Sequence, residues 1–341
     1  MQRLKQSFSI NRFYKSFNKR VFIIAEIGIN HEGSVDKCIE MINKAKDSGA
    51  DAIKIQTMDP NENYCKNSKS YEIFSKSKLT DQQTFQIFDY CRKKDIKIFT
   101  TVGDKRSLNF IKKLKPFAFK ISSGLLNHVV LLNEILRMNK PTVISTGMAN
   151  KNDLNILKES LKKFNNQKIC ILHCISLYPT PQKLLCFDYI QNLKDDFNLP
   201  IGYSDHTTDP LIPSYAVLSG AVMIEKHFTF DEKRLGYDHH ISFNSKKFCK
   251  MVSEIRRIEE IMFSDNLNQE KKKIRLEFSR CIVAKKKIEK NEILSEKNLS
   301  IKRPSSPKNR GADPIHLNYV MGKKINKNMD KDSPIKLKDV F

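Results

Sequence analysis

Two histidines in this sequence stand where they could bind a metal ion together. His206 and His227 each close a short apolar run, in the segments IGYSDH and MIEKHF. Neutral imidazoles suit divalent transition metals, although ligand softness alone does not separate manganese from zinc or iron. A single histidine at such a position is usually a hydrogen-bonded part of the scaffold, but a pair beside Asp205 and Glu225 favours a metal site. A metal held there would polarise a carbonyl oxygen or hold a water molecule.

Two lysines occupy comparable positions and could bind an anion. Lys54 and Lys120 each lie near the end of an apolar run, and lysine is rarely buried unless it pairs with an anion. Hydroxyl side chains near other runs complete a set that suits a phosphate or a carboxylate: Thr101, Ser123, Ser145 and Ser204. The chain has no G-x-x-x-x-G-K-[ST] loop, so side chains must bind the anion, and a small phosphorylated acid is favoured over a nucleotide. Solvated surface lysines and hydroxyls are the alternative.

The elements that must position these side chains are short runs rich in Val and Ile, separated by amphipathic helical patterns. They predict strands at 21–28, 52–57, 96–102, 118–122, 142–147, 169–174, 201–206 and 223–228. Eight alternating strand and helix units over about 250 residues predict an α/β fold, a closed (β/α)8 TIM barrel.

Barrels of this kind keep their active sites on the loops that follow the C-terminal ends of the strands. All eight predicted strands end in polar residues, whereas strands buried on both faces are normally apolar throughout. Besides the residues named above, these ends carry Glu26, Gln56, Thr100, Ser122, Thr146 and His173. Their convergence predicts one active-site pocket at the barrel mouth.

The sequence changes character after Phe278. The segments CIVAKKKIEKNEIL, LSIKRP and GKKINKNMDKDSPIKL are typical of short strands separated by charged turns. We therefore expect a basic N-terminal extension at 1–20, a catalytic barrel at 21–252, a helical linker at 253–280 and a small β-rich domain at 281–341. A module of about 60 residues buries little surface, so it needs a partner surface for stability.

The composition argues against some classes of function. The 341 residues include 61 Lys and Arg against 38 Asp and Glu, a net charge of +23. This excess is spread along the chain rather than gathered in one stripe with aromatic residues, so no nucleic-acid partner is expected. No apolar run approaches the roughly 18 residues that a membrane span needs. Cysteines without a C-x-x-C pair and the lack of an apolar signal segment favour the cytoplasm, although the basic start at 1–20 could also be a transit peptide.

Seven ordered motifs resemble the sialic acid synthase family, which includes N-acetylneuraminate, legionaminate and pseudaminate synthases. They are AEIGINHEGS at 25–34, DAIKIQT at 51–57, FKISSG at 119–124, VISTGM at 143–148, LHCISLYPTP at 172–181, IGYSDHT at 201–207 and IEKHFT at 224–229. KRP at 302–304 and VMGKK at 320–324 resemble the C-terminal antifreeze-like (SAF) domain of the same family. The resemblance covers residues 20 to 341.

The resemblance implies a transferase reaction for surface glycan biosynthesis. Phosphoenolpyruvate would condense with an open-chain N-acylated amino sugar to give a nine-carbon 2-keto-3-deoxy sugar acid and phosphate. The residues that would hold phosphoenolpyruvate are Lys54, Thr101, Lys120, Ser123, Ser145 and Ser204. His206 and His227 would hold a divalent metal, most often Mn2+, with Mg2+ or Co2+ as alternatives. Glu26 would lie near the metal or the attacking water, which makes Glu26, Lys54 and Lys120 the catalytic candidates.

The resemblance also implies sugar contacts and an assembly. Tyr178 and Asp238 would contact the sugar. Arg303, in the SAF domain, would meet the acyl group of the sugar in the site of the other subunit, so a domain-swapped homodimer is expected.

The sequence departs from the family pattern at positions that bear on the acceptor. Leu125 replaces a usual acidic residue, Val102 and Gly103 replace a proline and a phenylalanine, and Ser176 and Tyr237 replace an asparagine and a proline. Leu125 suggests either that Glu26 and a bound water suffice for the chemistry, or that the pocket is apolar and fits a 6-deoxy diacetamido hexose. We favour the second explanation.

Several alternatives stay open. A related phosphoenolpyruvate-condensing synthase could make a different keto-deoxy sugar acid, and a non-enzymatic binder of polyanions or ice could use the basic SAF domain. The binder predicts that 281–341 alone holds the activity and that His206 is dispensable. For the synthase, the acceptor could be N-acetylmannosamine, a 2,4-diacetamido trideoxy hexose or a phosphorylated sugar.

Overall fold

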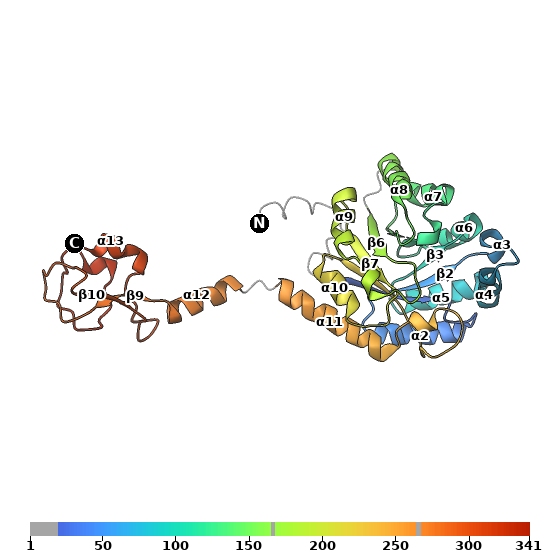
Figure 1. Cartoon of the computed structure of the whole chain (residues 1–341). Helices are drawn as coiled ribbons and strands as arrows, with labels where there is room; N and C mark the ends of the chain where they lie inside the picture. The colour runs from blue at the N-terminus through green and yellow to red at the C-terminus, as the bar shows by residue number, and fades with distance from the viewer. Residues whose placement is uncertain (1–19, 165–167, 264–266) are drawn as a thin grey trace. The chain divides into compact units, whose positions relative to one another are not determined.

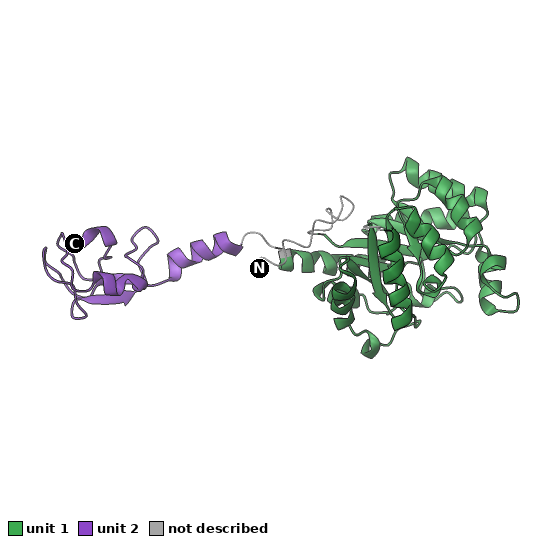
Figure 2. Cartoon of the chain, turned by 90° about the horizontal axis from the view of Figure 1, so that it is seen from above, with its two compact units in different colours: residues 1–263 green, residues 264–341 purple. Residues whose placement is uncertain are grey.

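The computed structural model of the chain describes residues 20–164, 168–263 and 267–341. The basic extension predicted at 1–20 therefore lies outside the described residues, apart from Arg20. The chain forms two compact units, Met1–Phe263 and Ser264–Phe341 (Figure 2). Each unit is described by itself.

The first unit has strands at its centre and helices around them (Figure 1). Eight parallel strands close into a barrel, with β8 paired to β1. The strands are β1 (Phe22–Gly28), β2 (Ala52–Thr57), β3 (Ile98–Val102), β4 (Phe119–Ile121), β5 (Thr142–Ser145), β6 (Ile169–Cys174), β7 (Ile201–Asp205) and β8 (Met223–His227). Every strand lies within its predicted segment, so the predicted TIM barrel is confirmed.

A helix follows each barrel strand and packs on the outside. These helices are α2 (Val35–Asp47), α5 (Asp81–Lys93), α6 (Lys105–Leu114), α7 (Val129–Arg137), α8 (Lys151–Phe164), α9 (Asp188–Phe197), α10 (Ile212–Leu218) and α11 (Ser245–Phe263). Local sequence sets where they begin: the Ser34 hydroxyl caps α2, and Thr80 with Gln83 forms a capping box at α5. Two extra short helices, α3 (Pro60–Asn63) and α4 (Lys69–Ser77), lie between β2 and α5.

Apolar side chains fill both sides of the barrel wall. The larger cluster lies between the strands and the outer helices, and a smaller one fills the N-terminal half of the lumen. The lumen cluster consists of Phe22, Ile24, Ala52, Phe99, Ala118, Val143, Cys170, Leu172 and Met223. This end of the barrel is therefore a packed core and leaves the opposite end free for a site.

The second unit has its own small core. Helix α12 (Leu267–Phe278) leads into an antiparallel pair, β9 (Cys281–Ala284) and β10 (Leu299–Lys302), and α13 (Leu317–Val320) follows. Isolated bridges such as Ile288 to Met329 extend the pairing. The buried side chains are Ile282, Ala284, Ile288, Leu294, Leu299, Val320, Ile325, Met329, Ile335 and Val340. The predicted β-rich character of the C-terminal domain is confirmed.

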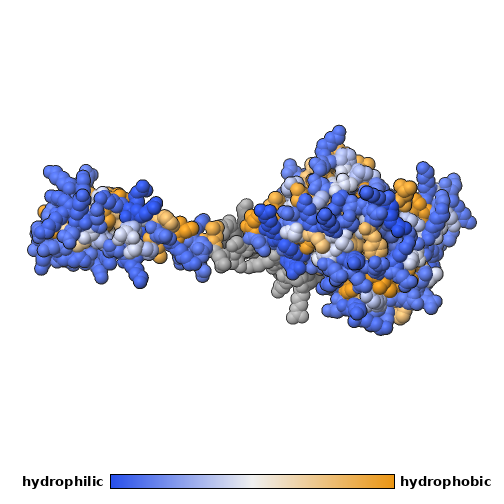
Figure 3. Space-filling model, turned by 90° about the horizontal axis from the view of Figure 1, so that it is seen from below, coloured by the Kyte–Doolittle hydropathy of each residue, from blue (hydrophilic) through white to orange (hydrophobic). Residues whose placement is uncertain are grey.

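None of the helices in the described ranges combines the length and the apolar character needed to cross a membrane. Hydrophilic residues cover most of the face shown in Figure 3, and apolar residues are confined to small patches there.

Candidate active site

The C-terminal ends of the barrel strands enclose a cavity of about 510 Å³. All the candidate site residues predicted in the barrel line it: Glu26, Lys54, Thr101, Lys120, Ser123, Ser145, Tyr178, Ser204, His206, His227 and Asp238. Arg303 belongs to the second unit, where its guanidinium lies 5.1 Å from the ring centre of Phe278. Residues from all eight strands or the loops after them therefore meet in one place.

The alternation of side chains along a strand explains this convergence. Residues two apart point to the same face, so the residue two positions after each apolar lumen residue also faces the lumen. These pairs are Ile24 and Glu26, Ala52 and Lys54, Phe99 and Thr101, Ala118 and Lys120, Val143 and Ser145, Leu172 and Cys174, Gly202 and Ser204, and Met223 and Glu225. The apolar layer of the lumen is therefore followed, two residues further along each strand, by a polar layer.

Some predicted strand-end residues point the other way. Asp205 forms a fully buried ion pair with Lys226 at 2.8 Å and accepts a hydrogen bond from the Tyr203 hydroxyl. The Nε2 atom of His173 lies 2.7 Å from the carbonyl oxygen of Leu185. Asp205 therefore occupies the outward-facing position of β7 and is not among the residues that line the cavity with the two histidines. Strand β6 contributes Cys174 to the cavity instead of His173, and only the two-residue alternation could have indicated it.

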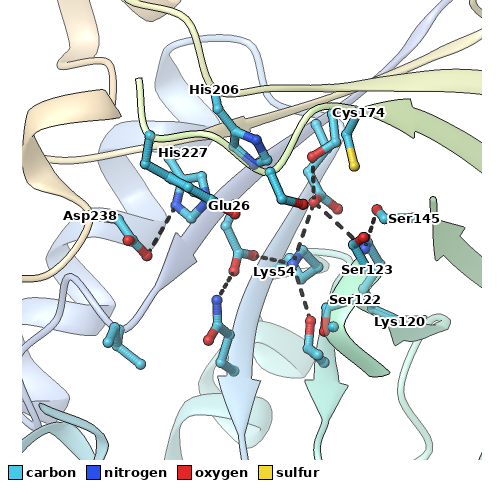
Figure 4. A pocket seen from close by; sticks show the side chains of 18 of the residues that line it. Glu26, Lys54, Lys120, Ser122, Ser123, Ser145, Cys174, His206, His227 and Asp238 are labelled. Atoms are coloured by element: carbon cyan, nitrogen blue, oxygen red, sulfur yellow. Dashed lines mark hydrogen bonds and ion pairs between the residues drawn. The ribbon is translucent and has the colours of Figure 1, made fainter. Parts of the chain in front are cut away.

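Buried charges of opposite sign form the floor of the cavity (Figure 4). Lys54 Nζ lies 2.8 Å from Glu26 Oε2 and 3.6 Å from Glu225 Oε1, and Lys120 Nζ lies 3.8 Å from the same Glu225 oxygen. Gln56 donates a hydrogen bond to Glu26 at 2.9 Å. The two lysines are therefore held by two carboxylates.

Burial and these ion pairs shift the pKa values of the carboxylates and lysines of the floor in different directions. Burial raises the pKa of Glu26 to about 7, although Lys54 opposes the shift. Burial also lowers the pKa of Lys120. For Lys54 and Glu225 the effect of burial is outweighed by their ion pairs, so the pKa of Lys54 is raised and that of Glu225 is lowered. Glu225 is thus the firmly ionised carboxylate of the floor.

Hydroxyl groups surround the two lysines. Lys120 Nζ donates to Ser145 Oγ at 2.6 Å, and Lys54 Nζ donates to Thr101 Oγ1 at 3.2 Å. Ser204 Oγ donates to Glu225 at 3.2 Å. Two ammonium groups and several hydroxyls in one buried space make a donor-rich site that suits an anion with several oxygens.

The two histidines lie beside this floor with their ring centres 5.7 Å apart. His206 Nδ1 lies 2.8 Å from the carbonyl oxygen of Ile175; since a carbonyl only accepts, Nδ1 carries the proton and Nε2 keeps a free lone pair. Burial lowers the pKa of His206 to about 4 and holds the pKa of His227 well below its usual value. His227 Nδ1 is buried without a hydrogen bond, 3.7 Å from Asp238 Oδ2.

This arrangement fits a metal with two protein ligands. A histidine binds a metal in its neutral form. Such a histidine usually donates the N–H of its other ring nitrogen to a carbonyl or carboxylate oxygen, which fixes the orientation of the ring. Within the described ranges, no group of three or more His, Cys, Asp and Glu side chains has a metal-binding arrangement. Substrate or water would therefore have to complete the coordination of a metal held by these histidines.

The departures from the family pattern fall in different environments. Ser176 and Tyr237 line the cavity. Val102 is fully buried in the outer core, by which we mean the larger apolar cluster between the strands and the outer helices. Leu125 ends the short 3-10 helix η2 (Ser123–Leu125), and its partly buried side chain packs against the outer core and does not line the cavity. Leu125 is therefore not among the residues that line the cavity, and its predicted contact with the sugar stays a prediction.

Aromatic and apolar side chains that the sequence prediction missed line one side of the cavity. They come from the segment between β2 and α5: Met58, Tyr64, Ile73 and Phe74. Tyr178 lies on another side, with its ring centre 4.3 Å from that of His206.

Comparison with known proteins agrees with this fold. The NeuB family model matches residues 41–266, and the SAF domain model matches residues 279–340. A pseudaminic acid synthase of Campylobacter jejuni is 33% identical over 337 residues, covering 94% of this chain and 97% of the relative. An N,N'-diacetyllegionaminic acid synthase of the same species is 33% identical over 340 residues, covering 93% and 99%.

A solved structure shows the same likeness. The N-acetylneuraminic acid (sialic acid) synthetase of Leptospira borgpetersenii, in complex with citrate, matches with a TM-score of 0.71 and 32% identity, covering 76% of this chain and 93% of that one. The family model spans more than half of the chain, and the relatives align along almost its whole length. The chain therefore belongs to the NeuB family, the sialic acid synthases, and carries the SAF domain at its C-terminus.

Proposed function

We propose that this enzyme condenses phosphoenolpyruvate with an open-chain N-acylated amino sugar to give a nine-carbon 2-keto-3-deoxy sugar acid and phosphate. The observation that carries the proposal is the placement of two buried lysines and their hydroxyl partners beside two neutral histidines in one cavity. The printed names of the relatives, pseudaminic acid synthase and N,N'-diacetyllegionaminic acid synthase, favour an amino sugar as the acceptor.

The floor of the cavity supports the binding of phosphoenolpyruvate. Its phosphate and carboxylate would be neutralised by Lys54 and Lys120 and would accept hydrogen bonds from Thr101, Ser145 and Ser204. Ser123 lies at the same end and completes the set. Because Lys54 and Lys120 share Glu225 as a partner, both ammonium groups are held close together before the anion arrives.

The reaction exchanges bonds at two carbon atoms. The methylene carbon of phosphoenolpyruvate attacks the aldehyde carbon of the sugar, the aldehyde oxygen takes up a proton and becomes a hydroxyl group, and cation character develops at the enol carbon. Water adds to that carbon, the bond between this carbon and the phosphate oxygen breaks, and the ketone forms as phosphate leaves. Glu26 lies in the floor beside Lys54, where its carboxylate would accept a proton from the attacking water. Tyr178 and Asp238 border the same cavity and would contact the sugar.

His206 and His227 would hold a divalent metal, with Mn2+ favoured over Mg2+ and Co2+. When bound, such a metal supplies Lewis-acid polarisation of the sugar aldehyde oxygen. The protein's own contribution is to keep both imidazoles neutral through burial and to orient His206 through the Ile175 carbonyl.

A phosphate-release assay tests the proposed function. Phosphoenolpyruvate and Mn2+ are supplied with N-acetylmannosamine, a 2,4-diacetamido trideoxy hexose or a phosphorylated amino sugar. Phosphate release that requires one of these acceptors supports the proposal, and the product mass should equal the sum of pyruvate and the acceptor. Activity only with an acceptor that is not an amino sugar would instead show a related keto-deoxy acid synthase, and no release with any acceptor would contradict the synthase.

We further propose that the active enzyme is a domain-swapped homodimer in which Arg303 meets the acyl group of the sugar bound by the partner subunit. In the described part of the chain Arg303 makes no ion pair, and its guanidinium rests on Phe278. Mixing an Arg303→Ala variant with a His206→Ala variant should restore part of the activity that each lacks. No recovery after demonstrated subunit exchange would show that Arg303 acts within its own chain. All cysteines in the described ranges are free thiols, which fits the cytoplasm that we propose as its location.

A further inference from the structure

The segment between β2 and α5 forms an apolar wall on one side of the cavity. Met58, Tyr64, Ile73 and Phe74 line the cavity from this segment, and we call these four residues the apolar wall. Ile73 is 38% exposed, so the wall reaches the mouth. The exposed hydroxyl of Ser70 lies among them.

Asp104 ties the segment that carries the wall to the barrel. Asp104 Oδ2, at the start of α6, accepts hydrogen bonds from the backbone N–H of Asp59 at 2.7 Å and from Asn63 Nδ2 at 3.1 Å. A Cβ atom added at Gly103 would lie 2.4 Å from Asn63 Oδ1 and 2.7 Å from Met58 Cβ. The segment therefore packs closely against the barrel because residue 103 has no side chain, and Gly103 sets the position of the wall.

The chemistry of the wall differs from that of the floor. The rings of Tyr64 and Phe74 lie 5.0 Å apart, and the Tyr64 hydroxyl donates to Met58 Sδ at 3.4 Å. The polar atom of Tyr64 is therefore used within the wall, and Met58, Ile73 and Phe74 bring no strong donor or acceptor in their side chains. A sugar hydroxyl held against this surface would lose hydrogen bonds to water, whereas a methyl group would gain contact.

The arrangement of floor and wall determines which end of the acceptor meets the wall. Under the proposed function the aldehyde carbon must lie at the floor, next to the lysines and histidines that would hold the other reactants. An open-chain sugar then extends from the floor towards the mouth, where Ile73 is exposed. Its far end, carbons five and six, is the part that can reach the apolar wall.

We propose that the apolar wall determines acceptor specificity by selecting an amino sugar whose far end carries a methyl group in place of a hydroxymethyl group. This inference rests on the proposed function and adds the residues that select the substrate. Gly103 acts as a positioning residue for the wall.

The test compares two acceptors that differ only in the hydroxyl at carbon six, a 6-deoxy sugar and its 6-hydroxy counterpart. The wild type should show kcat/KM about tenfold or more higher for the 6-deoxy sugar. Phe74→Ser should narrow that ratio while leaving the KM for phosphoenolpyruvate unchanged. Gly103→Ala should also narrow the ratio, because the added Cβ moves the wall. Phe85→Ala is the matched control, since Phe85 is 49% exposed on α5, and it should keep the wild-type ratio.

Calorimetric binding of the same two sugars separates this inference from the proposed function. If no phosphate is released with any acceptor, the proposed chemistry fails, but tighter binding of the 6-deoxy sugar that Phe74→Ser weakens would still support the wall. Equal kcat/KM and equal affinity for the two sugars in the wild type would overturn the inference. The inference would also be overturned if Phe74→Ser and Phe85→Ala changed the ratio of kcat/KM between the two sugars by the same amount.

Discussion

The two ends of the barrel lumen are made by the same strands and differ in almost every property. At the N-terminal end Ile24, Ala52 and Met223 belong to an apolar cluster, while two residues further along Glu26, Lys54 and Glu225 form a network of buried charges. Apolar packing stabilises the fold, whereas buried ion pairs often stabilise it no more than apolar residues of similar volume would. The polar end is therefore retained for what it binds, and the apolar end supports it.

The strongest test of this difference between the two ends of the lumen is to remove Glu225, the carboxylate that Lys54 and Lys120 share. Glu225→Leu should lower the free energy of unfolding by about 3–5 kcal/mol, because Lys54 and Lys120 lose a buried counter-charge. Met223→Leu, on the same strand in the apolar layer, should cost less than about 1.5 kcal/mol. Urea unfolding measures both values.

A double variant distinguishes loss of charge balance from loss of packing. Glu225→Leu with Lys120→Met should regain most of the stability, since one cation leaves with the carboxylate, but it should show no activity. If the double variant is as unstable as Glu225→Leu, packing rather than charge governs this end of the lumen.

The next largest effect is expected at the histidine pair. His206→Ala should lower kcat by about 100- to 1,000-fold, because several kcal/mol of polarisation would be lost, and a chelator should have the same effect on the wild type. His173→Gln is the control, since its imidazole faces the Leu185 carbonyl outside the lumen. Full activity of His206→Ala in metal-stripped buffer would end the metal hypothesis.

A smaller effect is expected at the lysine that donates to Ser145. Lys120→Met should raise the KM for phosphoenolpyruvate about 10- to 100-fold, and that for the sugar much less, because a charge-assisted hydrogen bond contributes about 1.5–3 kcal/mol. Lys113→Met, on the exposed face of α6, should leave both constants unchanged. Steady-state kinetics with each substrate varied in turn gives these values, and an unchanged KM in Lys120→Met would show that the anion binds elsewhere.

The smallest effect is expected at Leu125. Leu125→Glu should lower stability by about 1 kcal/mol, since the side chain packs partly buried against the outer core, and it should not change the ratio of kcat/KM between the two acceptors. A thermal melt and the two-acceptor assay measure these quantities. A changed ratio would support Leu125 as a sugar contact and weaken the assignment of specificity to the apolar wall.

Much of the barrel and its site could be predicted because both depend on local patterns. Val- and Ile-rich runs separated by helical patterns fix the number and order of the strands, and the closed barrel brings their C-terminal ends to one mouth. The polar residues at those ends therefore predicted the floor and the histidine pair. The second unit could be predicted for the same reason, because its paired strands β9 and β10 lie close together in one stretch of the sequence.

Alternation along a strand separates its residues into two faces, but the tertiary structure decided which of the two faces the lumen. Asp205 and Ser204 are neighbours in sequence, yet one forms an ion pair outside the lumen and the other donates to Glu225 within it. Strand register and the tilt of the barrel set which of two adjacent residues faces the lumen, and a list of polar strand ends does not contain that information.

The sequence by itself determined the fold class, the family and the chemical types gathered at the barrel mouth. Only the tertiary structure decided that Leu125 turns towards the outer core and that Met58, Tyr64, Ile73 and Phe74 border the cavity. The physical reason is that this wall depends on long-range packing: the segment after β2 lies against Gly103 and Asp104 after β3, and no local pattern in either segment specifies that contact.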